Sequence, residues 1–328
     1  MSQRSADHCT GALFTAASGI NKSYILVAGT RFVAPRSIAF HSYKGGTGKT
    51  TIGSNCAALL AKQGFKVALL DLDVYAPSLL AYFQRQPRKW LNDYLLGEAE
   101  VEDVMTDVTD LLEDYCAKYD KLSHIKGKLW IGFCSVKKED VYKIEGSNPE
   151  SSKAQLRRFI VLRDRLVRDY DLDYIIIDTS PGIRYWSINA LAVADVLFLT
   201  LKMGDIDLEG TKRLASEIYA SLTKYGTKSF LLFNRVAGYC LPSHHEVSES
   251  GLEGKEISGE PARLPEPSAA WDMEGEMSRE TKMDVISAIP CYCDMQFSRK
   301  EFLTALQYPT HPFTKKMESL TEPLAAKT

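Results

Sequence analysis

The chain alternates short, uninterrupted apolar runs with longer stretches in which apolar residues recur every three or four positions. Lys66 to Leu70 and Tyr174 to Asp178 are runs of the first kind, which is typical of strands buried on both faces of a parallel sheet. Similar runs predict further strands at 37–43, 128–136, 196–201, 229–236 and 285–290. The helical spacing predicts helices at 49–64, 90–121, 153–170, 187–194, 207–225 and 313–328.

This alternation of strands and helices predicts an α/β fold. We expect a single doubly wound, mainly parallel sheet of about seven or eight strands, with helices on both faces. Ligands in such folds bind beyond the carboxyl ends of the strands. Asp73, Asp178, Asn234 and a glycine-rich segment at 44–51 each lie at or just after the carboxyl end of a predicted strand. We therefore expect them to meet at one edge of the sheet.

The pattern also divides the chain. Residues 36–328 form the predicted α/β domain, and residues 1–35 are an extension that we expect to be partly ordered, with an edge hairpin at 24–34. Residues 237–284 are rich in Glu, Ser, Gly and Pro and predict an acidic, mobile insertion. A structureless loop of that length is uncommon inside a compact domain, so the insertion is either a docking segment or a disordered spacer.

Composition narrows the class of protein. The 328 residues are 45% apolar and 25% charged, with a formal net charge of −2, so global charge predicts no polyanionic partner. The seven cysteines are scattered and are interpreted as reduced thiols. No run approaches the ~20 apolar residues that cross a bilayer, and the first residues make a poor secretory signal. We expect a cytoplasmic protein, peripheral to a membrane at most.

The glycine-rich segment, KGGTGKTT, runs from Lys44 to Thr51. Its glycines let backbone N–H groups turn inward around phosphate oxygens, and the following helix points its positive end at the anion. Lys49 would supply a charge to the β- and γ-phosphates, and Thr50 a hydroxyl to Mg²⁺. The predicted nucleotide contacts are Gly45, Gly46, Thr47, Gly48, Lys49, Thr50 and Thr51. The GxxxxGK[ST] pattern itself fails by one residue, because Tyr43 stands at its first glycine.

With its additional lysine, Lys44, this segment resembles the ParA/MinD/Mrp superfamily of deviant Walker-A P-loop ATPases. Residues 70–78, LDLDVYAPS, resemble the switch I of that family and are closest to its Mrp branch. Residues 175–182, IIIDTSPG, are similar to its Walker B strand and switch II. Residues 230–235, FLLFNR, are similar to the strand that carries an asparagine to the adenine.

The resemblance implies roles for single residues. Lys44 would reach across a nucleotide-sandwich dimer to the partner's phosphates, acting with Lys49 in catalysis, and Asp73 would orient the attacking water. Asp178 would hold Mg²⁺ through water, while Asp71 would lie near the ion.

The same resemblance places the base of ATP beside the strand at 230–235. Asn234 would present the donor and acceptor of its amide to the adenine edge, with Arg235 next to it. The implied cofactors are therefore ATP and Mg²⁺.

The implied activity is hydrolysis of ATP to ADP and phosphate by a switch that forms a homodimer in its ATP state, in the partitioning or positioning of a cargo. An alternative is a metallocofactor carrier of the Mrp or CooC type, in which Cys291 and Cys293 are soft metal ligands. Mrp-type carriers use Cys-x-x-Cys, which this chain lacks here, so two inert thiols are the competing interpretation. A further alternative is a nucleotide-responsive scaffold with negligible turnover.

Candidate partners are non-specific DNA and a cargo or activator protein. The predicted helix at 153–170 carries several arginines that could bind DNA, although interspersed aspartates favour a solvated face. The tail at 313–328 has apolar residues at helical spacing but few cations, which makes a membrane a less favoured partner.

Overall fold

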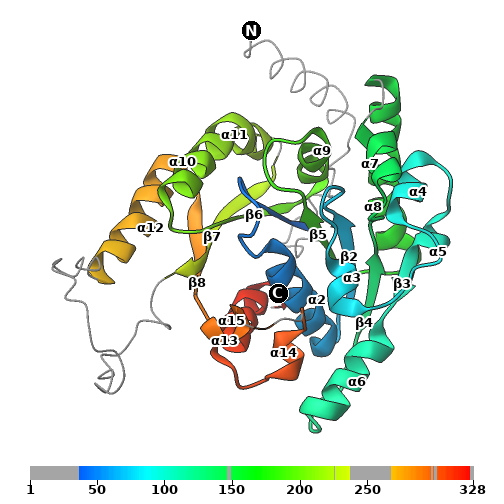
Figure 1. The fold of residues 1–328 in the computed structure, drawn as a ribbon, viewed down its shortest axis with the longest axis horizontal. Coiled ribbons are helices and arrows are strands. Elements are labelled where there is room, and N and C mark those ends of the chain that lie inside the picture. Colours follow the sequence, from blue (N-terminus) through cyan, green and yellow to red (C-terminus); the bar gives the residue numbers. More distant parts are fainter. Residues whose placement is uncertain are drawn as a thin grey trace, which may run out of the picture.

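The computed structural model describes residues 37–145, 149–224, 226–236, 267–296, 298 and 301–325. Its centre is an eight-stranded sheet with the order β3-β4-β2-β5-β1-β6-β7-β8 (Figure 1). The strands are β1 (Ser37–His41), β2 (Lys66–Leu72), β3 (Met105–Asp107), β4 (Lys128–Gly132), β5 (Tyr174–Thr179), β6 (Val196–Leu201), β7 (Lys228–Val236) and β8 (Asp284–Pro290).

Every neighbouring pair in the sheet is parallel except β3 and β4. The predicted single, mainly parallel α/β sheet is therefore confirmed. Strand β1 lies between β5 and β6, and Phe40 pairs with both Asp178 and Phe198. All residues of β1, β5 and β6 are buried, as expected of central parallel strands that are covered on both faces.

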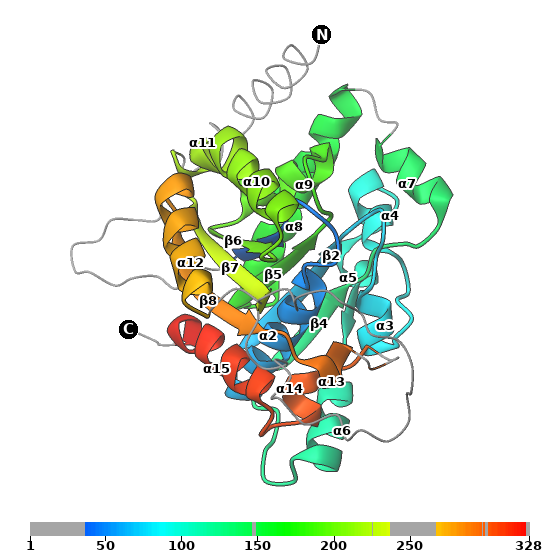
Figure 2. The same cartoon turned by 60° about the vertical axis from the view of Figure 1, so that its left-hand side comes forward.

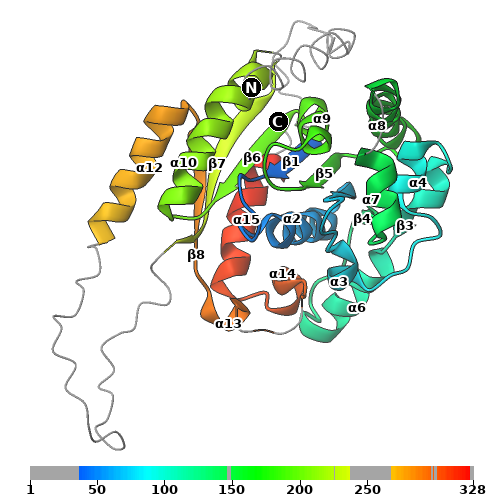
Figure 3. The same ribbon diagram turned by 45° about the horizontal axis from the view of Figure 1, so that its top comes forward.

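The helices cover both faces of the sheet, as Figures 2 and 3 show from two further directions. They are α2 (Lys49–Gln63), α3 (Leu79–Phe83), α4 (Leu91–Leu96), α5 (Val101–Val104), α6 (Thr109–Tyr119), α7 (Lys138–Glu145), α8 (Pro149–Asp169), α9 (Tyr185–Val193), α10 (Asp205–Leu214), the π-helix η1 (Ala215–Tyr219), α11 (Ala220–Thr223), α12 (Pro267–Thr281), α13 (Cys293–Gln296), α14 (Thr304–Gln307) and α15 (Pro312–Ala325).

Alternate residues of the strands feed two separate hydrophobic cores. Ile38, Leu69 and Ile176 pack with α2, α6 and α15 on one face. Their chain neighbours, such as Ala39 and Leu70, pack with α4, α8 and α10 on the other. This period of two fixes the register of each strand, and so the position at which each strand delivers its last residue to the edge.

Two predicted segments differ from the structure. Residues 90–121 are not one helix: α4 ends at Leu96, where Gly97 with its positive φ of 83° caps it, and β3 then pairs with β4. The expected insertion at 237–284 is wrong in its last part, because 267–281 form α12 and Asp284 begins β8. Residues 237–266, and the extension with its hairpin, lie outside the described residues.

Helix α12 was not predicted from the sequence because its exposed side chains are mainly acidic. Its Met277 is buried, while Glu276 and Glu280 form ion pairs with Lys212 of α10. The acidic composition predicted disorder because a local count of charges shows the glutamates alone. Lys212, which neutralises them, is more than sixty residues earlier in the chain.

Candidate functional site

The residues that the sequence singled out meet at the carboxyl edge of the sheet. The loop after β1 carries the glycines and ends at α2, the loop after β2 carries Asp73, and Asp178 is in β5 next to it. Asn234 near the end of β7 completes the site from the other side. The prediction that these side chains share one edge is confirmed by this arrangement.

Backbone conformation in the phosphate loop depends on glycine at two positions. Gly46 and Gly48 have φ values of 72° and 94°, in the left-handed region. A Cβ atom on Gly48 would also lie 2.2 Å from Nδ2 of Asn234. Helix α2 starts directly afterwards, so its free N–H groups point into the loop as in other phosphate-binding helices.

Lys49 is held inside this loop. Its side chain amine donates to Oγ of Ser42 at 2.9 Å, and the residue is only 6% exposed. Burial lowers the pKa of Lys49, and the nearby carboxylates of Asp178 and Asp73 oppose that shift. The ammonium is therefore poorly hydrated and placed to bind an anion strongly.

Thr50 and Asp178 form the next part of the site. The Thr50 hydroxyl donates to Oδ2 of Asp178 at 2.5 Å and accepts from Oγ of Ser78 at 3.2 Å. Burial raises the pKa of Asp178 to about 6, although Lys49 and Thr50 counteract it. Oδ1 of Asp178 is buried and has no hydrogen-bond partner of acceptable geometry among the described residues.

These oxygen atoms fit a divalent cation. Mg²⁺ prefers a hydroxyl or carboxylate oxygen together with water and phosphate oxygens, and the unsatisfied Oδ1 of Asp178 is such a group. Thr50 and Asp178 would hold the ion, which would neutralise charge on the phosphates. Asp71 is placed differently: its carboxylate accepts the backbone N–H groups of Asp73 and Leu79, so it shapes switch I.

Asp73 is 9% exposed and lies where switch I and switch II meet. Its Oδ1 accepts hydrogen bonds from Oγ of Ser180 at 2.7 Å and from the backbone N–H of Ala76 at 3.2 Å. The guanidinium of Arg184 stacks over the ring of Tyr75 at 4.6 Å, a second contact between the two loops. Sequence reasoning missed Ser180 and Arg184, because only the fold brings these loops together.

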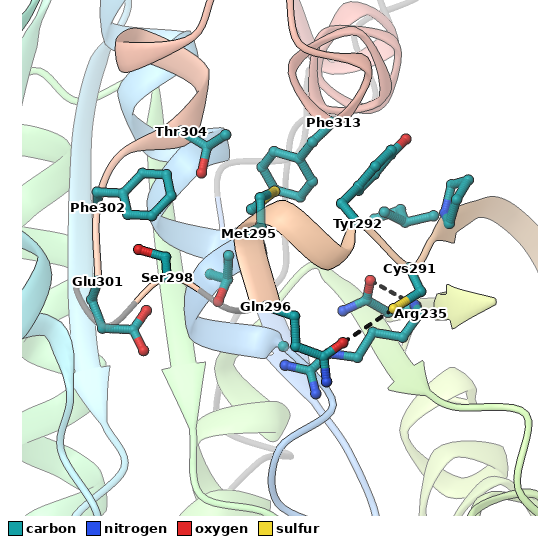
Figure 4. Close-up of a pocket in the computed structure, with 15 residues that line it drawn as sticks. Arg235, Cys291, Tyr292, Met295, Gln296, Ser298, Glu301, Phe302, Thr304 and Phe313 are labelled. Carbon is teal, nitrogen blue, oxygen red and sulfur yellow. Dashed lines mark hydrogen bonds between the residues drawn. The ribbon is translucent and has the colours of Figure 1, made fainter. Parts of the chain in front are cut away.

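A pocket opens beside the phosphate loop, where the base of a nucleotide was expected (Figure 4). Asn234 and Arg235 line it with residues of the β8–α13 segment, including Cys291. The Asn234 amide donates to the carbonyl of Thr47 at 2.7 Å and accepts the N–H of Arg235 at 2.9 Å. Asn234 therefore braces the phosphate loop in this structure, a role that the sequence did not predict.

Two further lysines, Lys44 and Lys202, lie at the phosphate loop. Lys44 is half-buried and forms no ion pair with a described residue, so its charge is not used within the described chain. Lys202 follows β6, and its amine would be 3.7 Å from a Cβ atom on Gly46. Asp73 and Asp178 were selected as polar residues at or just after the end of a buried strand, and Lys202, which follows β6, meets the same criterion.

The two cysteines proposed as metal ligands have different environments. Cys291 donates its thiol to the side-chain amide oxygen of Gln296 at 3.1 Å, whereas Cys293 is the first residue of α13. In the described ranges, no group of three or more His, Cys, Asp or Glu residues is arranged to hold a metal ion.

The arginines of α8 bond mainly to the protein itself. Arg158 and Arg163 donate to the carbonyls of Leu95 and Val193, and Arg165 pairs with Glu102 and other acids. Charge that is already paired releases fewer counterions on DNA, so this helix makes a weak DNA surface.

The predicted C-terminal helix is present as α15, but its apolar face is covered. Phe313, Met317 and Leu320 are buried in the core with α2, so they are not exposed to a bilayer. Among the described residues, no helix is long and apolar enough to span a membrane.

A glycine-rich loop at a helix N-terminus, a buried lysine and two strand-end aspartates define a P-loop nucleotide-binding protein. The model of the CobQ/CobB/MinD/ParA nucleotide-binding domain family matches residues 38–266. This is more than half of the chain, which therefore belongs to this family of P-loop ATPases.

A curated relative is similar to part of the chain. A cytosolic Fe-S cluster assembly factor Nubp2 homolog of Drosophila erecta is 36% identical over 141 residues, which are 43% of this chain and 45% of that protein. The chain thus matches under half the length of this curated relative.

Solved structures support the fold alone. The cell division ATPase MinD of Pyrococcus furiosus has a TM-score of 0.59 at 22% identity, covering 88% of this chain and 97% of that one. MinD of Pyrococcus horikoshii, complexed with Mg-ADP, has a TM-score of 0.58 at 19% identity and covers 89% and 96%.

Proposed function

We propose that the chain is a switch that binds Mg-ATP, dimerises in the ATP state and hydrolyses ATP to ADP and phosphate. The observation that carries this proposal is the position of Asp73, which Ser180 of switch II holds at 2.7 Å beside the pair of Thr50 and Asp178. A carboxylate fixed there can orient a water molecule towards a γ-phosphate bound by Lys49.

The loops give this site two states. Gly182 of switch II donates its N–H to the carbonyl of Ser42 at the start of the phosphate loop, at 2.8 Å. A γ-phosphate would therefore bias both switches at once, since Asp73 is bonded to the same segment through Ser180. Lys44, whose charge is unpaired within the described chain, is available to contact the phosphates of a second copy.

The experiment compares the full chain with its Asp73→Ala and Lys49→Ala variants. We expect Asp73→Ala to bind ATP and to dimerise, with phosphate release reduced by about a hundredfold or more. Lys49→Ala should lose nucleotide binding. Full phosphate release by Asp73→Ala would refute the assignment of switch I, and absence of release by the unmodified chain would favour the nucleotide-responsive scaffold.

Two cargo roles follow from this switch. Partitioning or positioning of a cargo is one, and nucleotide-dependent binding of Asp73→Ala to duplex DNA at two salt concentrations tests its DNA form. Transport of a metallocofactor is the other, and the likeness to the Nubp2 homolog favours it. Iron or another metal in protein purified without oxygen, lost on double substitution of Cys291 and Cys293, would support the carrier role.

A further inference from the structure

The aromatic ring of Tyr43 lies directly on the backbone of a helix. Tyr43 begins the phosphate loop, at the position where the GxxxxGK[ST] pattern has its first glycine. A Cβ atom on Gly210 of α10 would lie 2.0 Å from Cδ1 and 2.2 Å from Cε1 of this ring. Gly210 is buried inside the helix, where glycine is less favourable than alanine. The ring gives a physical reason for this glycine, because no larger residue fits without displacing it.

The backbone of Tyr43 is held by the phosphate loop and by switch II. The hydroxyl of Ser42 donates to the carbonyl of Lys44 at 2.6 Å and so spans Tyr43. The same hydroxyl accepts from the ammonium of Lys49 at 2.9 Å, and the Ser42 carbonyl accepts the N–H of Gly182. Tyr43 is therefore fixed by the two parts of the site that a γ-phosphate is expected to bias, the lysine of the loop and switch II.

Helix α10 extends from this contact to the surface beside the nucleotide site. Ile206 in its first turn is 67% exposed, and Lys202 just before the helix approaches Gly46 of the phosphate loop. In the π-helix η1, which continues α10, Tyr219 stacks on His41 with ring centroids 6.3 Å apart. The chain that leads into the loop thus touches this helical segment at two points, so the position of α10 is linked to that of the loop.

We propose, on the basis of the ATP switch above, that Tyr43 is a positioning residue that links the phosphate loop to α10 and thereby to dimerisation. When ATP binds, the loop and switch II fix the backbone of Tyr43, and its ring fixes α10 in the position that accepts a second copy of the chain. Without the ring, nucleotide still binds, but the γ-phosphate no longer favours the dimer. The atoms that meet Gly210 are ring carbons, so the hydroxyl of Tyr43 is not required.

The experiment measures dimerisation of the full chain by light scattering over a range of concentrations, with ADP and with the non-hydrolysable ATP analogue AMP-PNP. Nucleotide affinity is measured separately on dilute protein. Tyr43→Ala should keep both nucleotide affinities within about threefold and lose about tenfold or more in the affinity of the AMP-PNP dimer, a usual magnitude for coupling between two sites. Tyr43→Phe should dimerise as the unmodified chain does.

A control variant and a double variant separate this contact from a general loss of packing. Tyr170→Ala removes a half-buried ring that packs on Trp130 of β4, which β2, β5 and β1 separate from β6, and it should keep the AMP-PNP dimer. Gly210→Ala places a Cβ atom where the Tyr43 ring lies, so it should weaken the dimer as Tyr43→Ala does. In the double variant of Tyr43 and Gly210 the ring is absent, and the second change should add nothing.

Active protein is counted by the stoichiometry of ADP binding, so an unfolded fraction does not enter the comparison. An unchanged AMP-PNP dimer in Tyr43→Ala, a weakened one in Tyr43→Phe, or additive losses in the double variant would overturn the role of the ring. Loss of nucleotide affinity as large as the loss of dimerisation would overturn it too, because Tyr43 would then serve the nucleotide site itself. Failure of the unmodified chain to dimerise with AMP-PNP would overturn the proposed function as well.

Discussion

Ser180→Ala tests whether switch II positions Asp73, the carboxylate proposed to act in catalysis. The hydroxyl of Ser180 is buried and donates to Oδ1 of Asp73 at 2.7 Å, while the N–H of Ala76 donates to the same oxygen at 3.2 Å. The substitution removes the shorter bond and keeps the longer one. A hydrogen bond to a charged group contributes about 1.5–3 kcal/mol, which corresponds to a loss of about 10- to 150-fold in the rate of hydrolysis.

The assay is steady-state phosphate release, with ATP affinity measured separately. The Ser180 hydroxyl also lies 3.5 Å from the carbonyl of Leu72, a long contact, so the effect should fall on kcat and leave the affinity for ATP unchanged. Ser54→Ala is the control, because it removes a buried hydroxyl of α2 that has no hydrogen-bond partner in the described chain. An unchanged kcat in Ser180→Ala would refute the reasoning.

Two other predictions concern acid stability and assembly. Burial, followed by the charge of Lys49, lowers the pKa of His41 from 6.5 to about 3, so the unfolded chain binds the extra proton between these values and stability falls as the pH drops below 6.5. At pH 5 the loss is about 2 kcal/mol relative to pH 7.5, and urea unfolding of His41→Asn should lack it; an equal pH dependence in both proteins would contradict this. Ile206, 67% exposed at the start of α10, should lie in the dimer interface, since Lys202 just before it approaches Gly46. Ile206→Asp should weaken ATP-dependent dimerisation by about tenfold or more, measured by light scattering. Leu122→Asp is the control and should not weaken it, because Leu122 is 95% exposed in the loop that leads into β4, away from the phosphate loop.

The core strands could be predicted from the sequence because burial on both faces makes consecutive residues of a strand apolar. Val196–Leu201 was predicted with the bounds that β6 has, and β5 and β7 differ by one residue. A strand buried on both faces must be apolar throughout, whatever its neighbours are. The phosphate loop was predictable for a similar reason, since its glycines, Lys49 and Thr50 are consecutive residues that bind one ligand.

What could not be predicted depends on residues far apart in the chain. The acidic α12 is stabilised by Lys212, and Ser180 reaches Asp73 only because β2 and β5 are neighbours in the sheet. Asn234 was assigned to the base from its residue type, but the contact that decides its geometry is the Thr47 carbonyl. Spacing in the sequence carries no information on such pairs.

The charges of the site indicate why its ligand should be the magnesium salt of ATP. Asp178 and Asp73 face the buried ammonium of Lys49, and burial together with repulsion from these two carboxylates raises the pKa of Asp71 well above its ordinary value. A free triphosphate would add negative charge to carboxylates that already repel one another. A divalent cation next to Asp178 offsets both sets of charges at once, because it lies between carboxylate and phosphate oxygens. If the proposed function holds, metal and nucleotide should therefore stabilise each other in this site.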